Sequence, residues 1–191
     1  MRYARAPANA LPGVHDTGLQ AYGWLSLNRR GTWLIRGAPV THPAVRDYLA
    51  AHFRADAHGC WHVRNGPQLA YVALETAPLI VWLEADGHWH SHLGRPTGAP
   101  TAALLDEHGG LWLDTPAGPA WADEGAFERI AAALVDAGGD AATAEQIEAL
   151  GAGRGAPVWL ECGGARVPVA ACPRAQVPGR LRFVPVPRPA A

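Results

Sequence analysis

The chain has 191 residues, 16 basic and 17 acidic side chains, and a formal net charge of −1 at pH 7. A charge balance this close to neutral argues against binding to nucleic acid or to a membrane surface through net charge. With 49% apolar and 17% charged residues, the composition is typical of a soluble globular protein that buries a sizeable core, and it excludes disordered and fibrous classes away from the chain ends.

The residue types that the sequence lacks limit the catalytic mechanisms open to the protein. The sequence has no lysine, which excludes a Schiff-base lysine and the lysine of a phosphate-binding P-loop, and its glycine pairs do not form a dinucleotide-binding motif. These absences limit the catalytic repertoire, so a non-enzymatic protein is favoured over an enzyme, and the sequence leaves the cofactor unknown. The apolar run at 77–83 is far shorter than the roughly 20 residues of a membrane helix. The three cysteines, Cys60, Cys162 and Cys172, form no C-x-x-C pair, and the sequence shows no recognisable secretory signal. A reducing, cytoplasmic location of the protein is therefore expected.

The first half of the chain predicts β structure. Residues 1–20 have no periodicity and are expected to form an extended lead-in. Two stretches rich in β-forming residues, 23–27 and 32–36, flank a polar turn and predict a hairpin. A meander of antiparallel strands is then predicted over 60–64, 69–74, 79–84 and 88–92.

One helix interrupts this β structure. Pro43 is typical of a first helical turn, and Val45, Leu49 and Phe53 follow at helical spacing. We expect these three side chains to be buried against Trp33 or its neighbours.

A domain boundary is expected after the last strand of the meander. Asp86-Gly87 is a two-residue turn signal that would pair Leu83 with His90 and Val81 with His92. Residues 94–100 are rich in Gly, Pro and Thr, as connectors are. The expected division is an N-terminal domain over 21–96, a C-terminal domain over 97–172 and a Pro-rich tail over 173–191.

The second half repeats the order hairpin, proline-containing break and helix. The hairpin spans 104–114, the break follows at 115–119, and the helix runs from a cap at Asp123 to Gly138. Thr143 begins a capping box for a helix with no counterpart in the first half, and a last hairpin follows at 158–169. The expected fold class is α+β, with two antiparallel β-rich lobes that arose by a degenerate internal duplication and a helix packed on each sheet.

The tail alternates proline with apolar residues. Proline excludes a central strand, so an edge strand or a polyproline segment on the protein's own surface is expected. A polyproline ligand for a partner protein is the alternative.

A histidine cluster supports a metal-binding hypothesis. Residues at i, i+2 and i+4 of a strand share one face, so His88, His90 and His92 could ligate a transition metal. No further ligand is obvious from the sequence, and a partly exposed row of histidines is the alternative.

Arginine and tryptophan support a different hypothesis. Eight tryptophans are expected mainly to fill the core, and a subset could stack a ligand. Arginines near strand ends can contact a phosphate or carboxylate. We therefore expect a ligand cleft bordered by the turn at 65–66 and the loop at 92–95, with these candidate binding residues: Arg64, Asn65, Gln68, His92, Gly94 and Arg95.

Short motifs between residues 22 and 170 carry a family resemblance. They are Gly31-Thr32-Trp33, Gly37-Ala38-Pro39-Val40, Pro43, Gly59 to Val63, Asn65-Gly66-Pro67, Glu75-Thr76-Ala77-Pro78 and Gly94. On these motifs the chain resembles the uncharacterised proteobacterial family known as domain of unknown function 1285, or a sister family. The loop His92-Leu93-Gly94-Arg95 departs from the small polar residue and acid expected there, and the tail after Cys172 has no equivalent.

The resemblance implies a duplicated α+β core whose C-terminal domain is superficially similar to pleckstrin-homology folds. It also implies a groove between the domains, a nucleotide-like ligand and a signalling role. The favoured function is thus a cytoplasmic binding module for a small anionic or nucleotide-like ligand. The alternatives are a metal protein that uses the three histidines and a protein interaction domain.

Overall fold

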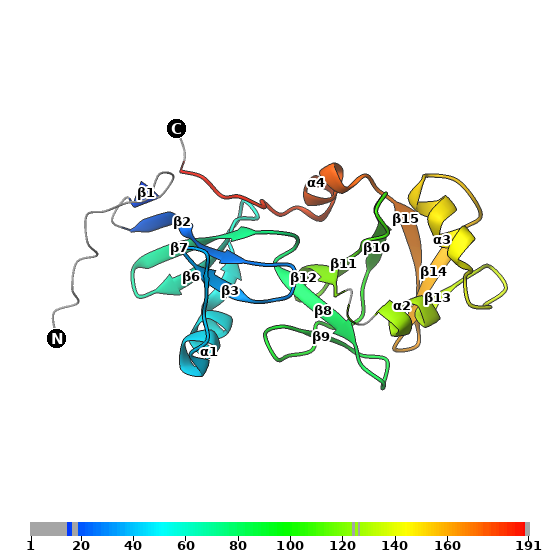
Figure 1. Cartoon of the computed structure of the whole chain (residues 1–191), viewed down its shortest axis with the longest axis horizontal. Coiled ribbons are helices and arrows are strands. Elements are labelled where there is room, and N and C mark those ends of the chain that lie inside the picture. The colour runs from blue at the N-terminus through cyan, green and yellow to red at the C-terminus, as the bar shows by residue number, and fades with distance from the viewer. Residues whose placement is uncertain (1–14, 17–18, 124, 126, 190–191) are drawn as a thin grey trace.

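The protein contains two mixed β-sheets arranged one after the other along its long axis (Figure 1). The computed structural model describes residues 15–16, 19–123, 125 and 127–189. In the first sheet the strand order is β4-β3-β2-β7-β6-β5, and β1 pairs with β2. The bounds are β1 His15–Asp16, β2 Gln20–Leu27, β3 Trp33–Ile35, β4 Ala38–Pro39, α1 Pro43–His52, β5 Phe53–Ala55, β6 Trp61–Asn65 and β7 Gln68–Leu74.

The second sheet has the order β13-β14-β15-β10-β11-β12-β8-β9. Its strands are β8 Leu79–Leu83, β9 Trp89–Ser91, β10 Ala102–Leu105, β11 Leu111–Thr115, β12 Gly118–Ala122, β13 Leu134–Val135, β14 Val158–Cys162 and β15 Ala165–Ala171. The helices of this half are α2 Phe127–Ala133, α3 Ala144–Gly151, the 3-10 helix η2 Arg174–Gln176 and α4 Val177–Leu181. Among the described residues, no helix is long and apolar enough to cross a membrane.

The topology confirms the duplication. Each half runs through three strands, a helix that passes directly into a short strand, and a final pair of strands. The order β4-β3-β2-β7-β6-β5 in one half corresponds strand by strand to β12-β11-β10-β15-β14-β13 in the other. The helix α3 has no counterpart in the first half, as the sequence predicted, because it is inserted between β13 and β14. Its capping box, Thr143 with Gln146, is also confirmed.

Four turns at equivalent positions of the two halves have the same hydrogen bonds. In each, the side-chain oxygen of the first residue accepts the N–H groups of the third and the fifth. Glycine at the fourth position has a φ between 76° and 90°, which other residues rarely adopt. The turns are Asn28–Thr32 and Asp56–Cys60 in the first half and Asp106–Gly110 and Asp136–Asp140 in the second.

The prediction that both lobes are purely antiparallel is wrong. Strand β2 pairs with β7 in parallel, and β10 pairs with β15 in the same way. A third parallel pair joins β8 to β12. Turn residues indicate only which sequential strands form hairpins, whereas each of these pairs joins strands that lie far apart in the chain.

The predicted boundary at 94–100 is also wrong for the sheets. Strands β8 and β9 belong to the second sheet, so the chain passes from one sheet to the other at residues 75–78. Strand β8 is buried on both faces, and it gains its second neighbour, β12, from a part of the chain that the local pattern does not reveal.

Several local predictions need correction. Helix α1 ends at His52 and α2 at Ala133, because a β-strand begins directly after each of them. Leu49 and Phe53 are buried as predicted. Val45 is 39% exposed, and Leu49 is the one residue of α1 that is buried. Residues 115–119, which were predicted as a break, contain the start of β12. Its first two residues, Gly118 and Pro119, are untypical of a strand, so the sequence pattern does not indicate one.

The register of the β8–β9 hairpin differs by one residue from the prediction. Leu83 pairs with Trp89 and Trp82 with His90. The loop is not a two-residue turn, because the N–H of Glu84 donates to the carbonyl of His88 and extends the connection. A one-residue change of register reverses the faces to which all side chains of the strand point.

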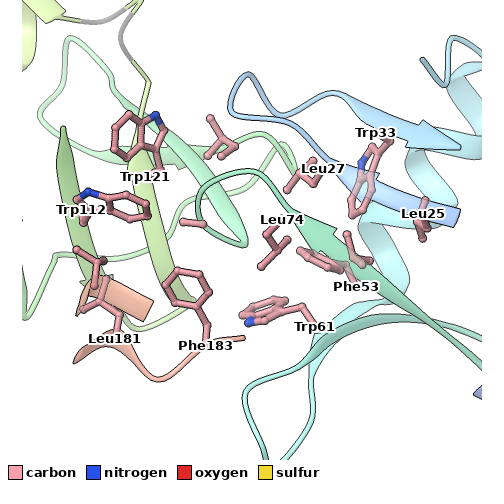
Figure 2. Close-up of a cluster of buried hydrophobic side chains, with 14 of the residues drawn as sticks. Leu25, Leu27, Trp33, Phe53, Trp61, Leu74, Trp112, Trp121, Leu181 and Phe183 are labelled. Atoms are coloured by element: carbon pink, nitrogen blue, oxygen red, sulfur yellow. The ribbon is translucent and has the colours of Figure 1, made fainter. Parts of the chain in front are cut away.

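Two apolar clusters form the core. The first lies between the sheets and combines the inner face of the first sheet with residues such as Ile80, Leu104, Trp112 and Trp121 of the second (Figure 2). The second covers the opposite face of the second sheet, where α2 and α3 pack.

The C-terminal segment, residues 173–189, is part of the first cluster. It forms η2 and α4 over 174–181, where an edge strand or a polyproline segment was predicted. Phe183 is buried between Trp112 and Trp61, and the N–H of Val184 donates to the carbonyl of Gly59 at 2.9 Å (Figure 2). A Cβ on Gly59 would lie 2.5 Å from the carbonyl oxygen of Arg182, so this approach requires glycine.

Replacing Phe183 by alanine is expected to lower the free energy of unfolding by about 3–5 kcal/mol, because it leaves a cavity between the sheets. Val186→Ala, in the same segment at a side chain 55% exposed, is the matched control and is expected to change it by less than about 0.5 kcal/mol. Urea unfolding measures both. Equal, small effects would show that the segment is not part of the core.

Candidate functional site

A pocket of about 260 Å³ opens between the two sheets. Arg29 and Arg30 line it from the β2–β3 turn of the first sheet, and Trp121 and Asp123 line it from the end of β12 in the second. Gly125 completes the lining. Figure 2 shows the loop that follows Leu27 turned towards the strand that carries Trp121. The pocket thus depends on both sheets.

The two arginines of the pocket are held differently. The backbone N–H of Arg29 donates to Glu75 Oε2 at 3.0 Å, and its Nε lies 3.8 Å from Glu75 Oε1. The backbone N–H of Arg30 donates to Asn28 Oδ1 within the turn, while its side chain is exposed. The turn therefore fixes both backbones and leaves the Arg30 guanidinium accessible to a ligand.

Trp121 lines the pocket but is almost fully buried. This side chain is 2% exposed. Trp112 packs against its ring at 4.6 Å between centroids, and the Arg174 guanidinium lies 5.3 Å above the ring. Because the ring is almost fully buried and Arg174 lies over it, Trp121 cannot serve as a stacking platform for a ligand.

An ion pair between the buried Asp106 and the partly exposed Arg174 lies beside Trp121. Asp106 is fully buried, and its Oδ2 accepts hydrogen bonds from Arg174 Nε and from the indole Nε1 of Trp112, both at 2.8 Å. Burial alone would raise the pKa of Asp106, but the hydrogen bonds from Arg174, Trp112 and the turn backbone outweigh it and lower that pKa. The carboxylate is thus stable as an anion and holds η2 against the β10–β11 turn.

The predicted site residues fall into two separate groups. Arg64, Asn65 and Gln68 surround the β6–β7 turn, where the Tyr48 hydroxyl donates at 3.1 Å to the carbonyl of Arg64 and to Asn65 Oδ1. Strand β7 runs from this turn to the inter-sheet linker, so the turn lies about 20 Å from the junction, at ~3.3 Å per residue. None of the six predicted residues lines the pocket described above.

The second group lies near the junction. His92 packs against Trp33, 5.7 Å between ring centroids, and its Nδ1 accepts the N–H of Ile80 at 3.2 Å. A Cβ on Gly31 would lie 2.6 Å from the Cβ of His92, so the β2–β3 turn rests directly on this side chain. Gly94 and Arg95 are exposed in the turn that follows. His92 supports the turn that carries Arg30 and does not face the pocket.

The three histidines considered as metal ligands occupy different surroundings. His88 is exposed, with its Nδ1 3.3 Å from Asp86 Oδ1, His90 pairs with Trp82, and His92 is turned towards Trp33. Within the described part of the chain, no group of three His, Cys, Asp or Glu side chains is placed to hold a metal ion.

Comparison with known proteins gives the family. The family model DUF2944, described as "Protein of unknown function (DUF2946)", matches residues 17–188. The chain belongs to this family. None of the curated proteins compared with the chain matches it.

Solved structures connect the family to the resemblance seen in the sequence. A DUF1285 family protein from Silicibacter pomeroyi DSS-3 is 15% identical, with a TM-score of 0.53 over 78% of this chain and 80% of that one. A DUF1285 family protein from Shewanella baltica OS155 is 12% identical, with a TM-score of 0.43 over 56% of this chain and 88% of that one. The first likeness confirms the two-lobed α+β fold, and the second is too low to carry an argument.

Sequence reasoning missed the residues of the pocket. The adjacent arginines in the turn Asn28–Gly31 were visible, and so was Asp123 as a polar residue after β-rich sequence. Their proximity depends on the parallel pairing of β8 with β12, which places the end of β12 beside the first sheet. No local sequence pattern indicates the pairing of β8 with β12.

The environment of His92 makes stability depend on pH. Burial, and secondarily the charge of Arg95, lowers the pKa of His92 from 6.5 to about 4. Between these values the unfolded chain binds more protons than the folded one. The free energy of unfolding is therefore expected to fall as the pH drops from 7 towards 4, by at most about 1.4 kcal/mol per pH unit from this group.

Substitution isolates this contribution. His92→Asn keeps an acceptor near the position of Nδ1 but does not titrate, so urea unfolding at pH 7 and pH 5 should show a smaller difference than in the wild type. His88→Asn, at an exposed histidine, is the control and should keep the wild-type difference. An unchanged difference in His92→Asn would contradict the assignment.

Proposed function

We propose that this protein is a non-enzymatic binding module that holds a small anionic ligand in the pocket between its sheets. The observation that carries the proposal is the joint lining of the pocket by Arg29 and Arg30 from one sheet and by Trp121 and Asp123 from the other. Guanidinium groups bind carboxylates and phosphates through charge-assisted hydrogen bonds. A ligand there would contact both halves of the duplication.

The size of the pocket limits the ligand. Pockets for drug-sized molecules measure about 300–1,000 Å³, and this one measures about 260 Å³. A mononucleotide is therefore the upper limit of a nucleotide-like ligand, with its phosphate at Arg30 and its base not stacked on Trp121.

The proposal also includes a cellular location and a signalling role. We place the protein in the reducing cytoplasm, which is supported by its three free cysteines. A signalling role would follow from a ligand that bridges the sheets, because such a ligand favours one arrangement of the two halves over others.

The test compares two locations for the site. Inorganic phosphate, small carboxylates and mononucleotides are screened by thermal shift, and the best binder is titrated against variants. Arg30→Ala should weaken its binding about 10- to 100-fold, the loss of one charge-assisted hydrogen bond. Arg64→Ala and Arg95→Ala should bind as the wild type does.

Loss of binding in Arg64→Ala or Arg95→Ala, with Arg30→Ala unaffected, would move the site to the residues expected from the sequence. If no anion raises the melting temperature, the proposal fails.

A further inference from the structure

We infer that the ligand of this pocket is a small zwitterion, which carries an anionic group for Arg30 and an ammonium group for Asp123. The inference rests on the proposed function and narrows its ligand class. It starts from two opposite charges that line one pocket without neutralising each other.

Arg30 and Asp123 are both available to a ligand. Among the interactions of the described residues, the Arg30 guanidinium and the Asp123 carboxylate take part in no ion pair and no side-chain hydrogen bond. Arg29, in contrast, lies against Glu75. The backbone N–H of Asp123 donates to the carbonyl of Val81 at 2.7 Å, which fixes the residue at the end of β12. Asp123 is thus positioned by the sheet while its carboxylate remains unused.

The charge balance selects against a simple anion. Arg29 lies against Glu75, and among the described residues that line the pocket the other charged side chains are one cation, Arg30, and one anion, Asp123. A phosphate or carboxylate alone would gain from Arg30 but would be repelled by Asp123. A ligand that also carries an ammonium group pairs with both Arg30 and Asp123.

The pocket geometry selects for a compact ligand. The volume of about 260 Å³ excludes long chains, and the burial of Trp121 excludes an aromatic ring stacked on it. Because Arg30 belongs to the first sheet and Asp123 to the second, the two ends of the ligand would each bind one half of the protein. Small amino acids and amino-alkyl phosphates have this arrangement of charges.

The experiment uses matched probes that differ only in the amine. The full-length protein is titrated with 2-aminoethyl phosphate and ethyl phosphate, and with β-alanine and propionate, and binding is followed by NMR chemical-shift changes. In the wild type, the amine-bearing member of at least one pair should bind about tenfold tighter than its partner. Asp123→Asn should remove this preference, and Arg30→Ala should weaken both members of the pair.

The outcomes separate this inference from the proposed function. If in neither pair the amine-bearing member binds more tightly than its partner, and Arg30→Ala still weakens binding, the zwitterion is refuted and the anion pocket stands. If no probe binds, both fail. The comparison of the paired probes in the wild type needs no variant. For Asp123→Asn, a nearly isosteric change, circular dichroism checks that the variant is folded, so that a lost preference does not reflect unfolding.

Discussion

The apolar face of the first sheet must be buried from water, and the C-terminal segment completes this burial. Helix α1 supplies only Leu49, so most of the face must be buried by the second sheet together with Val177, Leu181 and Phe183. The segment is anchored by Arg174, whose Nε lies 2.8 Å from the buried Asp106. Loss of Arg174 is costly because the fully buried Asp106 carboxylate then has no charged partner. This anchor and the apolar burial beside it hold the two sheets in contact.

The duplication explains why the second sheet has an extra helix. Both halves present one strongly apolar face, and each half has a single equivalent helix, α1 or α2. In the first half the remainder of that face is covered by the following half. On the corresponding face of the second half α3 packs, with Ile147 and Leu150 against the second apolar cluster.

The sequence predicted local elements well and non-local pairing poorly. The hairpins, the Pro43 helix and the Thr143 capping box are specified by residues close together in the chain, and all are present. The three parallel pairs and the placement of β8 in the second sheet depend on partners far away in the chain. Phe183 is the clearest example: three prolines near it at 185, 187 and 189 suggested a surface tail, but the side chain fills the core.

The same distinction explains the site. The general idea of arginine and tryptophan at a junction of two lobes could be formed from composition, but the particular residues could not. Arg30 and Asp123 meet at one pocket only because β12 lies beside β8 and the β2–β3 turn rests on His92. Any ligand bound there depends on the packing of the sheets, and therefore on the C-terminal segment.

Native-state amide hydrogen exchange tests this dependence most directly. The N–H of Val184, bonded to the carbonyl of Gly59, reports whether the C-terminal segment opens separately. If the segment is part of the cover that holds the sheets together, this amide should exchange with the same opening free energy as the amides between β6 and β7. Fast exchange at Val184 while the sheet amides remain protected would show that the sheets pack without the segment, and would contradict the account.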